Sequence, residues 1–239
     1  MSQQGIRRRN FLKGAGAAGT AAAAALSGGL AACADSPGAP AAKAATATAE
    51  PLLTLNPSEA AFITAAIDTL IPADGLSPAA SECGVGVFID RQLAGAWGNG
   101  ARLYRDGPFF KGKPEHGYQL ALTPRDFFRA GIAAANEWSL KTYGKSFDRL
   151  SESEREAALQ AMESGKAQFA ELSARDFFEA LLGITMEGFF ADPIYGGNRD
   201  KAGWKMVGYP GLPAVYNDAI EKYRGKPYRP APQSIADFS

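Results

Sequence analysis

The sequence uses the same kind of helix start several times. An Asn, Ser or Thr is followed three residues later by Glu or Asp at Asn56, Thr123, Ser151 and Ser173. Such a pair satisfies backbone amides that the first turn of a helix leaves without partners, so each pair predicts a helix N-terminus. Ser77 with Pro78 indicates a fifth start, although Gly84 and Gly86 weaken its first turns. We therefore expect about five main helices.

Apolar residues follow these starts at helical spacing, and we expect them to form the core. They are Phe62, Ile63, Ala66, Ile67, Leu70 and Ile71 in the first helix, Phe127, Phe128, Ile132, Ala135, Trp138, Ser139 and Tyr143 after Thr123, and Phe177, Phe178, Leu181, Leu182 and Phe189 after Ser173. The helix after Ser151 is charged, and we expect it to be exposed. No stretch shows sustained strand alternation with hairpin turns. The predicted fold is all-α: one small helical domain with long irregular loops at 106–122 and after Asp192.

The composition of the N-terminal residues predicts a signal peptide. Residues 1–32 hold four basic residues and no acid, and an uncharged run rich in Ala and Gly follows the basic part. That run has too few large apolar residues for a good membrane span. Arg8, Arg9, Phe11 and Leu12, with the lysine after them, match the twin-arginine pattern, which implies export in the folded state to the periplasm. The alternative is an ordinary signal with a basic start.

The end of this leader resembles a lipobox. The residues are Leu30-Ala31-Ala32-Cys33, and acylation of Cys33 would attach the protein to a membrane surface. The alternative is cleavage elsewhere, for example after Ala45-Thr46-Ala47. Residues 33–55 are rich in Ala, Pro and Thr and predict a flexible tether, so residues 56–239 form the expected domain.

Composition argues against several function classes. Four of the 25 basic residues lie in the leader, so the rest of the chain has 21 basic and 25 acidic residues, a charge of about −4. A nucleic-acid binder would instead have a basic face. The chain has only Cys33, Cys83 and His116 as Cys or His residues, which makes a zinc site or a catalytic triad unsupported.

The remaining chemical motifs are weak. Gly84–Gly86 and Gly98–Gly100 do not have the sequence context of phosphate-binding loops, so we expect no cofactor in this chain. The acids Asp68, Asp74, Glu82 and Asp90 could do acid–base work, but exposed acids are ordinary at helix ends. We therefore predict no catalytic, cofactor-binding or metal-binding residue.

Four aromatic pairs also need an explanation. They are Phe109-Phe110, Phe127-Phe128, Phe177-Phe178 and Phe189-Phe190. One member of each pair fits an apolar helix face. For the other member, contact with a partner is one solution.

The sequence "FFADPIYGGNRDKAGWKMVGYPG", residues 189–211, combines glycines, polar residues and large aromatic side chains. Its glycines permit turns, and its aromatic residues are typical of interface anchors. We predict a partner interface made of Tyr195, Gly196, Gly197, Asn198, Arg199, Asp200, Trp204 and Tyr209. The alternatives are a purely structural loop and an active site, although the segment has no nucleophile–base pair.

Several segments together resemble the gluconate 2-dehydrogenase subunit 3 family over about residues 57–216. They are "IDTLIPADGLSPAASECGVGVFIDRQLAG", "YRDGPF", "GYQLALTPRDFFRAGI" and "TMEGFFADPIYGGNRDKAGWKMVGYPG". The most specific part is the D-P-x-Y-G-G-N-R-D run with the G-W and G-Y-P-G that follow.

The resemblance implies a small (gamma) accessory subunit of a periplasmic, membrane-associated dehydrogenase. In such complexes a large FAD-containing subunit oxidises a sugar or sugar acid such as gluconate, and a multihaem cytochrome c subunit passes the electrons to quinone. The small subunit is thought to help the large one mature and be exported by the twin-arginine machinery. The family supplies no catalytic residue, and the lipobox-like Cys33 is a departure from it. The rival hypothesis is an independent periplasmic enzyme or ligand-binding module that uses the Gly196–Asp200 loop.

Overall fold

The computed structural model describes residues 50–110, 112–113, 121–213 and 215–238. The predicted twin-arginine signal, Cys33 and His116 lie outside these residues. Within them the chain forms seven α-helices and no β-strand, which confirms the predicted all-α class. The helices are α2 (Pro57–Leu70), α3 (Val85–Ala94), α4 (Pro124–Tyr143), α5 (Glu152–Glu163), α6 (Ala174–Phe190), α7 (Ala202–Val207) and α8 (Asn217–Lys222).

The four helix starts with an acidic third residue are confirmed. At α2 and α5 the capping box is complete: the polar cap accepts from the glutamate amide, and the glutamate accepts from the cap amide. At α4 the Thr123 hydroxyl accepts from the Asp126 amide at 3.2 Å, and at α6 Ser173 and Asp176 make the same contact. These bonds join neighbouring residues, which is why the sequence alone located them.

The fifth start is wrong, because α3 begins at Val85 and not at Ser77. The Asp74 carboxylate accepts from the Ser77 amide and the Glu82 carboxylate accepts from the Ala79 amide, so turns occupy this segment. Side chains that bond nearby amides compete with helix formation. Gly84 then takes a left-handed conformation, with φ of 78°, directly before the helix.

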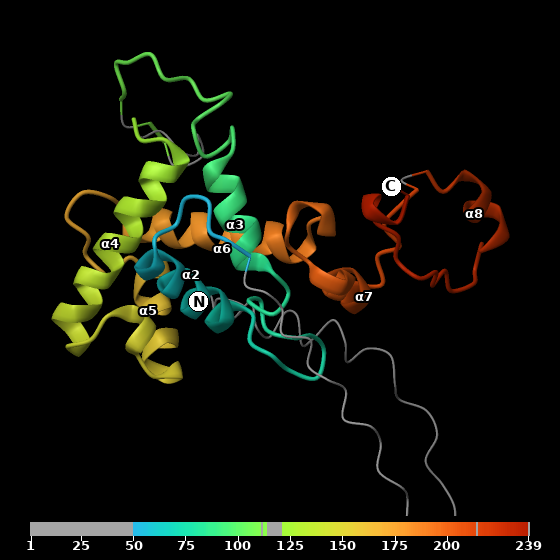
Figure 1. The fold of residues 1–239 in the computed structure, drawn as a ribbon, viewed down its shortest axis with the longest axis horizontal. Coiled ribbons are helices and arrows are strands. Elements are labelled where there is room, and N and C mark those ends of the chain that lie inside the picture. The colour runs from blue at the N-terminus through green and yellow to red at the C-terminus, as the bar shows by residue number, and fades with distance from the viewer. Residues whose placement is uncertain (1–49, 111, 114–120, 214, 239) are drawn as a thin grey trace, which may run out of the picture. The chain divides into compact units, whose positions relative to one another are not determined.

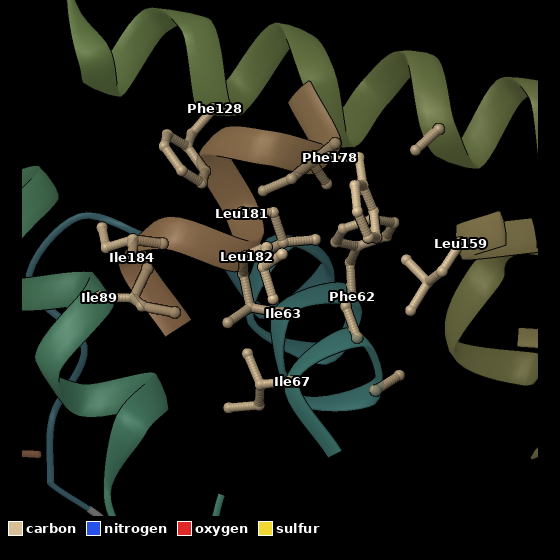
Figure 2. Packing of buried hydrophobic residues seen from close by; sticks show 14 of the residues in the cluster. Phe62, Ile63, Ile67, Ile89, Phe128, Leu159, Phe178, Leu181, Leu182 and Ile184 are labelled. Carbon is tan, nitrogen blue, oxygen red and sulfur yellow. The ribbon is translucent and has the colours of Figure 1, made fainter. Parts of the chain in front are cut away.

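Helix α6 lies at the centre of the domain and contacts α2, α3, α4, α5 and α7 (Figure 1). Its buried apolar face is wide, as expected for a helix with several neighbours, and its charged residues Arg175, Glu179 and Glu187 lie on one exposed stripe. Figure 2 shows side chains from α2 to α6 meeting in one cluster, among them Phe62, Ile89, Phe128, Leu159 and Leu181. The core face predicted for α2 is largely buried, and that for α4 is buried with Trp138 and Tyr143 at its margin.

The aromatic pairs and α5 show how far side-chain burial extends. In the pairs Phe127-Phe128 and Phe177-Phe178 both rings are buried, as predicted for the core, because α4 and α6 each have more than one neighbouring helix. No partner is needed to cover them. Helix α5 is less exposed than expected, since Ala158, Leu159 and Met162 pack into the core. In the pair Phe109-Phe110, by contrast, both rings are exposed.

Among the described helices, none has the length and apolar character that crossing a membrane requires.

Candidate docking site

The segment of residues 192–211, here called the glycine motif, follows α6 directly. We expected an irregular tail after Asp192, but the motif contains η4 (Pro193–Tyr195), η5 (Arg199–Lys201) and α7. Asn198, Asp200 and Lys201 have φ values of 47°, 56° and 57°. This left-handed conformation costs about 1–2 kcal/mol for a residue with a side chain, so other contacts must hold the backbone in place.

Asn198 supplies two of those contacts and is fully buried. Its Nδ2 donates to the carbonyl oxygen of Ala191 at 2.8 Å, and its Oδ1 accepts from the Gly203 amide at 2.8 Å. One side chain thus joins the segment that follows α6 to the first turn of α7. A side-chain amide is suited to this position because it donates and accepts at once.

The glycines of the motif permit close contact between backbone segments. A Cβ on Gly197 would lie 2.1 Å from the carbonyl oxygen of Gly188 in α6. A Cβ on Gly84, before α3, would lie 2.4 Å from the carbonyl oxygen of Gly196. Both distances are shorter than atoms allow, so these positions require glycine for packing and not only for a turn.

Arg199 fastens the motif to the segment before α3. Its amide donates to the Cys83 carbonyl oxygen at 2.8 Å, and its guanidinium donates to the Glu82 carbonyl oxygen at 3.3 Å. The Cys83 thiol is buried, and burial, followed by the charge of Glu82, raises its pKa. A thiol with a raised pKa is a poor nucleophile at neutral pH.

Trp204 is not the surface anchor that we predicted. Its side chain is 6% exposed, and its Nε1 donates to the Phe190 carbonyl oxygen at 2.7 Å. The ring meets Tyr209 edge to face, with 5.2 Å between the ring centroids. A buried indole with a satisfied N–H belongs to the interior.

The structure therefore divides the eight residues of the predicted interface. Three lie in the interior and hold the motif together: Gly197, Asn198 and Trp204. Gly196 is half-buried. The exposed residues are Tyr195, Arg199, Asp200 and Tyr209. Their contact with a partner stays a prediction.

A second segment, η6 (Ile235–Phe238), completes this surface. The Ile235 amide donates to Asp192 Oδ2 at 2.9 Å, while Asp192 Oδ1 accepts from the Ile194 amide at 3.0 Å. Lys201 also pairs with Asp237. These bonds place η6 beside η4, and four large apolar side chains remain exposed there.

We call this group the η4–η6 surface. It consists of Ile194, Tyr195, Ile235 and Phe238, and Phe238 is 65% exposed. Our sequence reasoning missed Ile235 and Phe238. The bond that brings them to η4 joins residues 43 positions apart, and no local pattern predicts such a contact.

The acidic residues considered for acid–base work have structural partners. Asp68 accepts from the Ser81 amide and hydroxyl, both at 2.8 Å. Asp90 is buried, and its carboxylate accepts from the amides of Leu53, Thr54 and Leu55 at 2.6, 3.0 and 2.8 Å.

This arrangement around Asp90 corrects the boundary of the expected tether. Residues 50–55, assigned to the tether from composition, are held against the domain. Arg129 also donates to the Thr54 carbonyl oxygen, and Glu50 pairs with Arg91. The ordered domain therefore begins at least as early as Glu50.

Across the described part of the chain, no group of three or more His, Cys, Asp or Glu residues is arranged to hold a metal ion. The polar groups of the motif bond mainly to the protein's own backbone. Next to the motif, the exposed apolar side chains of the η4–η6 surface lie on adjacent segments, and we take this surface as the candidate docking site.

Comparison with known proteins supports the family resemblance that the glycine motif suggested. The model of the family described as gluconate 2-dehydrogenase subunit 3 matches residues 57–211, which is more than half of the chain. The match runs from the first residue of α2 to the end of the glycine motif. No curated protein and no solved structure matches the chain. The chain belongs to the gluconate 2-dehydrogenase subunit 3 family.

Proposed function

We propose that this chain is the non-catalytic small subunit of a periplasmic, membrane-associated dehydrogenase complex. A large FAD-containing subunit of that complex oxidises a sugar or sugar acid of the gluconate type, and a multihaem cytochrome c subunit accepts the electrons. The small subunit binds the large one and aids its maturation and twin-arginine export. FAD and haem c belong to the partner subunits. Membership of a family of dehydrogenase subunits carries this proposal.

The η4–η6 surface supports a binding role. Its four apolar side chains come from two short helices whose backbones are fixed by Asp192, so they are presented in a defined arrangement. Exposed apolar side chains on adjacent segments are typical of interaction sites. Presentation on a fixed backbone lowers the entropy lost on association.

The rival is an independent enzyme or ligand-binding module that uses the Gly196–Asp200 loop. Hydrogen bonds within the domain argue against this role for the loop. Asn198 uses its amide group inside the domain, and Arg199 bonds two carbonyl oxygens near α3. A binding site would need such groups to face a ligand.

Purification from the native host tests the binding role. The full chain with an affinity tag should bring with it a larger protein with flavin absorbance, together with a haem spectrum. Mass spectrometry would identify the flavoprotein. A colourless monomer that binds a small ligand by itself would support the rival.

The export role is tested in the leader. Arg8→Lys combined with Arg9→Lys should leave both this chain and its flavoprotein in the cytoplasm, because the partner travels with the small subunit. A flavoprotein that still reaches the periplasm would remove the escort role.

Membrane attachment is tested by Cys33→Ser. If Cys33 carries lipid, this change should release the exported chain from membranes when the partner subunits are absent. Continued retention without the partners would exclude acylation as the anchor.

A further inference from the structure

Residues 212–233, here called the arm, form a loop whose two ends are bonded together. The Leu212 amide donates to the Gln233 carbonyl oxygen at 2.9 Å, and the Gln233 amide donates to the Pro210 carbonyl oxygen at 3.0 Å. Gly211 and Gln233 form an isolated bridge there. The arm contains α8 and is drawn in red tones in Figure 1.

The arm contributes nothing to the domain core. Among its described residues, 212–213 and 215–233, none is buried. Its side-chain contacts include ring contacts of Tyr216 and Tyr223 with Tyr228 and a contact of Lys222 with the Tyr223 ring, and the Tyr216 hydroxyl donates to the carbonyl oxygen of Gly211 at its base. Ordering a backbone costs about 1–2 kcal/mol per residue. A segment of this length that buries no side chain is typical of one that gains its stability from a partner.

Two apolar side chains of the arm are well exposed. Ile220, on α8, is 61% exposed, and Val215 is exposed to a similar degree just before the helix. Residues 234–238 follow the arm directly, and the Asp192–Ile235 bond holds them at the η4–η6 surface. The arm therefore joins the candidate docking site at its base.

The arm differs in charge from the rest of the domain. It has four basic residues and two acidic ones, a formal charge of +2: Lys222, Arg224, Lys226 and Arg229 against Asp218 and Glu221. Residues 50–211 have 16 basic and 21 acidic residues, a formal charge of −5. A basic segment on an acidic domain favours association with an acidic surface.

We propose that the arm captures the large flavoprotein subunit. Ile220 and Val215 insert into an apolar groove on that subunit, and the basic residues 222–229 pair with acidic residues at its rim. This inference rests on the proposed function, which supplies a larger partner chain. An anionic membrane is a poorer match, because Asp218 and Glu221 lie on the same short helix as Ile220.

The test uses the full chain, tagged and co-expressed with the flavoprotein of its complex. Ile220→Asp should weaken the complex at least tenfold, as expected for an anchor at the centre of an interface. Lys222→Glu with Arg224→Glu should slow association and make it less sensitive to salt. Leu140→Asp is the matched control, since Leu140 on α4 is 53% exposed. It should bind like the wild type.

The outcomes separate the two levels of the proposal. If the wild-type chain captures no flavoprotein, the proposed function itself fails. If wild type and Ile220→Asp bind the flavoprotein equally, only the role of the arm fails. Melting temperatures of the arm variants should agree with that of the wild type, because the arm lies outside the core, so a loss of binding cannot be assigned to unfolding.

Two further measurements can overturn the choice of partner. If light scattering of the purified chain shows a dimer that Ile220→Asp dissociates, the arm binds a second copy of this chain. If the chain with Cys33→Ser sediments with phosphatidylglycerol vesicles, and Lys222→Glu abolishes this binding, the arm binds an anionic membrane. We expect neither result.

Discussion

The helical body of residues 57–190 and the glycine motif are stabilised in different ways. In the body, five helices share one apolar cluster, and each buried side chain contacts several others. In the motif, a few polar atoms of Asp192, Asn198 and Arg199 fix a backbone that has left-handed residues. The free energy that stabilises the body is therefore spread over many contacts, whereas in the motif it comes from few contacts.

This difference predicts how each region responds to substitution. A packed core accepts apolar replacements of similar volume at modest cost. A backbone held by directed hydrogen bonds cannot adjust in that way, because the replacement must present the same donor or acceptor at the same place. Damage to the body should unfold the domain, whereas damage to the motif should act locally.

The largest effect is expected for Phe177→Ala in the body. Phe177 is fully buried, and its ring contacts those of Phe62, Phe127 and Phe128. Removing such a ring costs about 3–5 kcal/mol, which corresponds to a fall of about 6–20 °C in melting temperature for a domain of this size. Calorimetry checks this, with Leu140→Ala as an exposed control. A small local change would contradict the description of the body.

Asn198→Gly tests the motif and should cost about 2–4 kcal/mol. Glycine accepts the left-handed backbone, so the loss comes from the Ala191 carbonyl and the Gly203 amide, whose buried groups lose their partner. Hydrogen exchange should rise across residues 192–211 and change little in α2 to α6.

The matched control for this change is Asp200→Gly. Its φ of 56° is also left-handed, but its side chain is exposed. Replacement by glycine should leave the domain as stable or slightly more so. If both variants destabilise equally, the hydrogen bonds of Asn198 are not what holds the motif.

Asp90→Asn tests a polar contact inside the body and should cost about 1.5–3 kcal/mol. The amide retains the shape of the carboxylate, but it cannot accept all three backbone N–H groups of residues 53–55. Denaturant melts measure the loss, and hydrogen exchange should show residues 50–55 released first. Asp218→Asn on α8 serves as the exposed control. Unchanged exchange at residues 53–55 would contradict the role of Asp90.

The smallest effects are expected on acidification, at two carboxylates on the surface of the domain. Hydrogen bonds from Ser151 lower the pKa of Glu154, and the bond from Lys201 is the main cause that lowers the pKa of Asp237. A lowered pKa in the folded state stabilises the protein above the ordinary value of the group, and this contribution disappears as pH falls through the lowered value.

As pH falls, the first turn of α5 should therefore weaken below about pH 4.5, the ordinary pKa of Glu154, and the attachment of η6 below about pH 3.8, the ordinary pKa of Asp237. Hydrogen exchange as a function of pH should resolve the two sites separately. Glu154→Gln should abolish the change at α5 and leave that at η6, and Asp237→Asn should do the reverse. A shared response would mean that the two regions are coupled more closely than their contacts indicate.

The sequence predicted the body far better than the motif. The caps at Asn56, Thr123, Ser151 and Ser173 join residues three positions apart, so a local pattern contains all the information. Apolar periodicity then identified the core faces. It could not count the neighbours of a helix, which is why the charged helix α5 proved to bury Ala158, Leu159 and Met162.

The errors lie where distant segments meet. The start of α3 depends on Gly84, which lies so close to the backbone of Gly196 that there is no room for a Cβ atom. The burial of Asn198 and Trp204 depends on carbonyl groups at the end of α6. In sequence these residues have the chemistry of an exposed interface, and only the three-dimensional contacts assign them to the interior.

The bond between Asp192 and Ile235 has a consequence for synthesis of the chain. The ribosome adds about 5–20 residues per second, so residue 235 follows residue 195 by about 2–8 s. During that interval the helices up to α6 can fold, but the η4–η6 surface is incomplete because Ile235 and Phe238 have not been synthesised. A chain that stopped before residue 234 could keep its helical body and still lack this surface. A partner that binds the η4–η6 surface would therefore bind chains that contain η6 and not chains that stop before it.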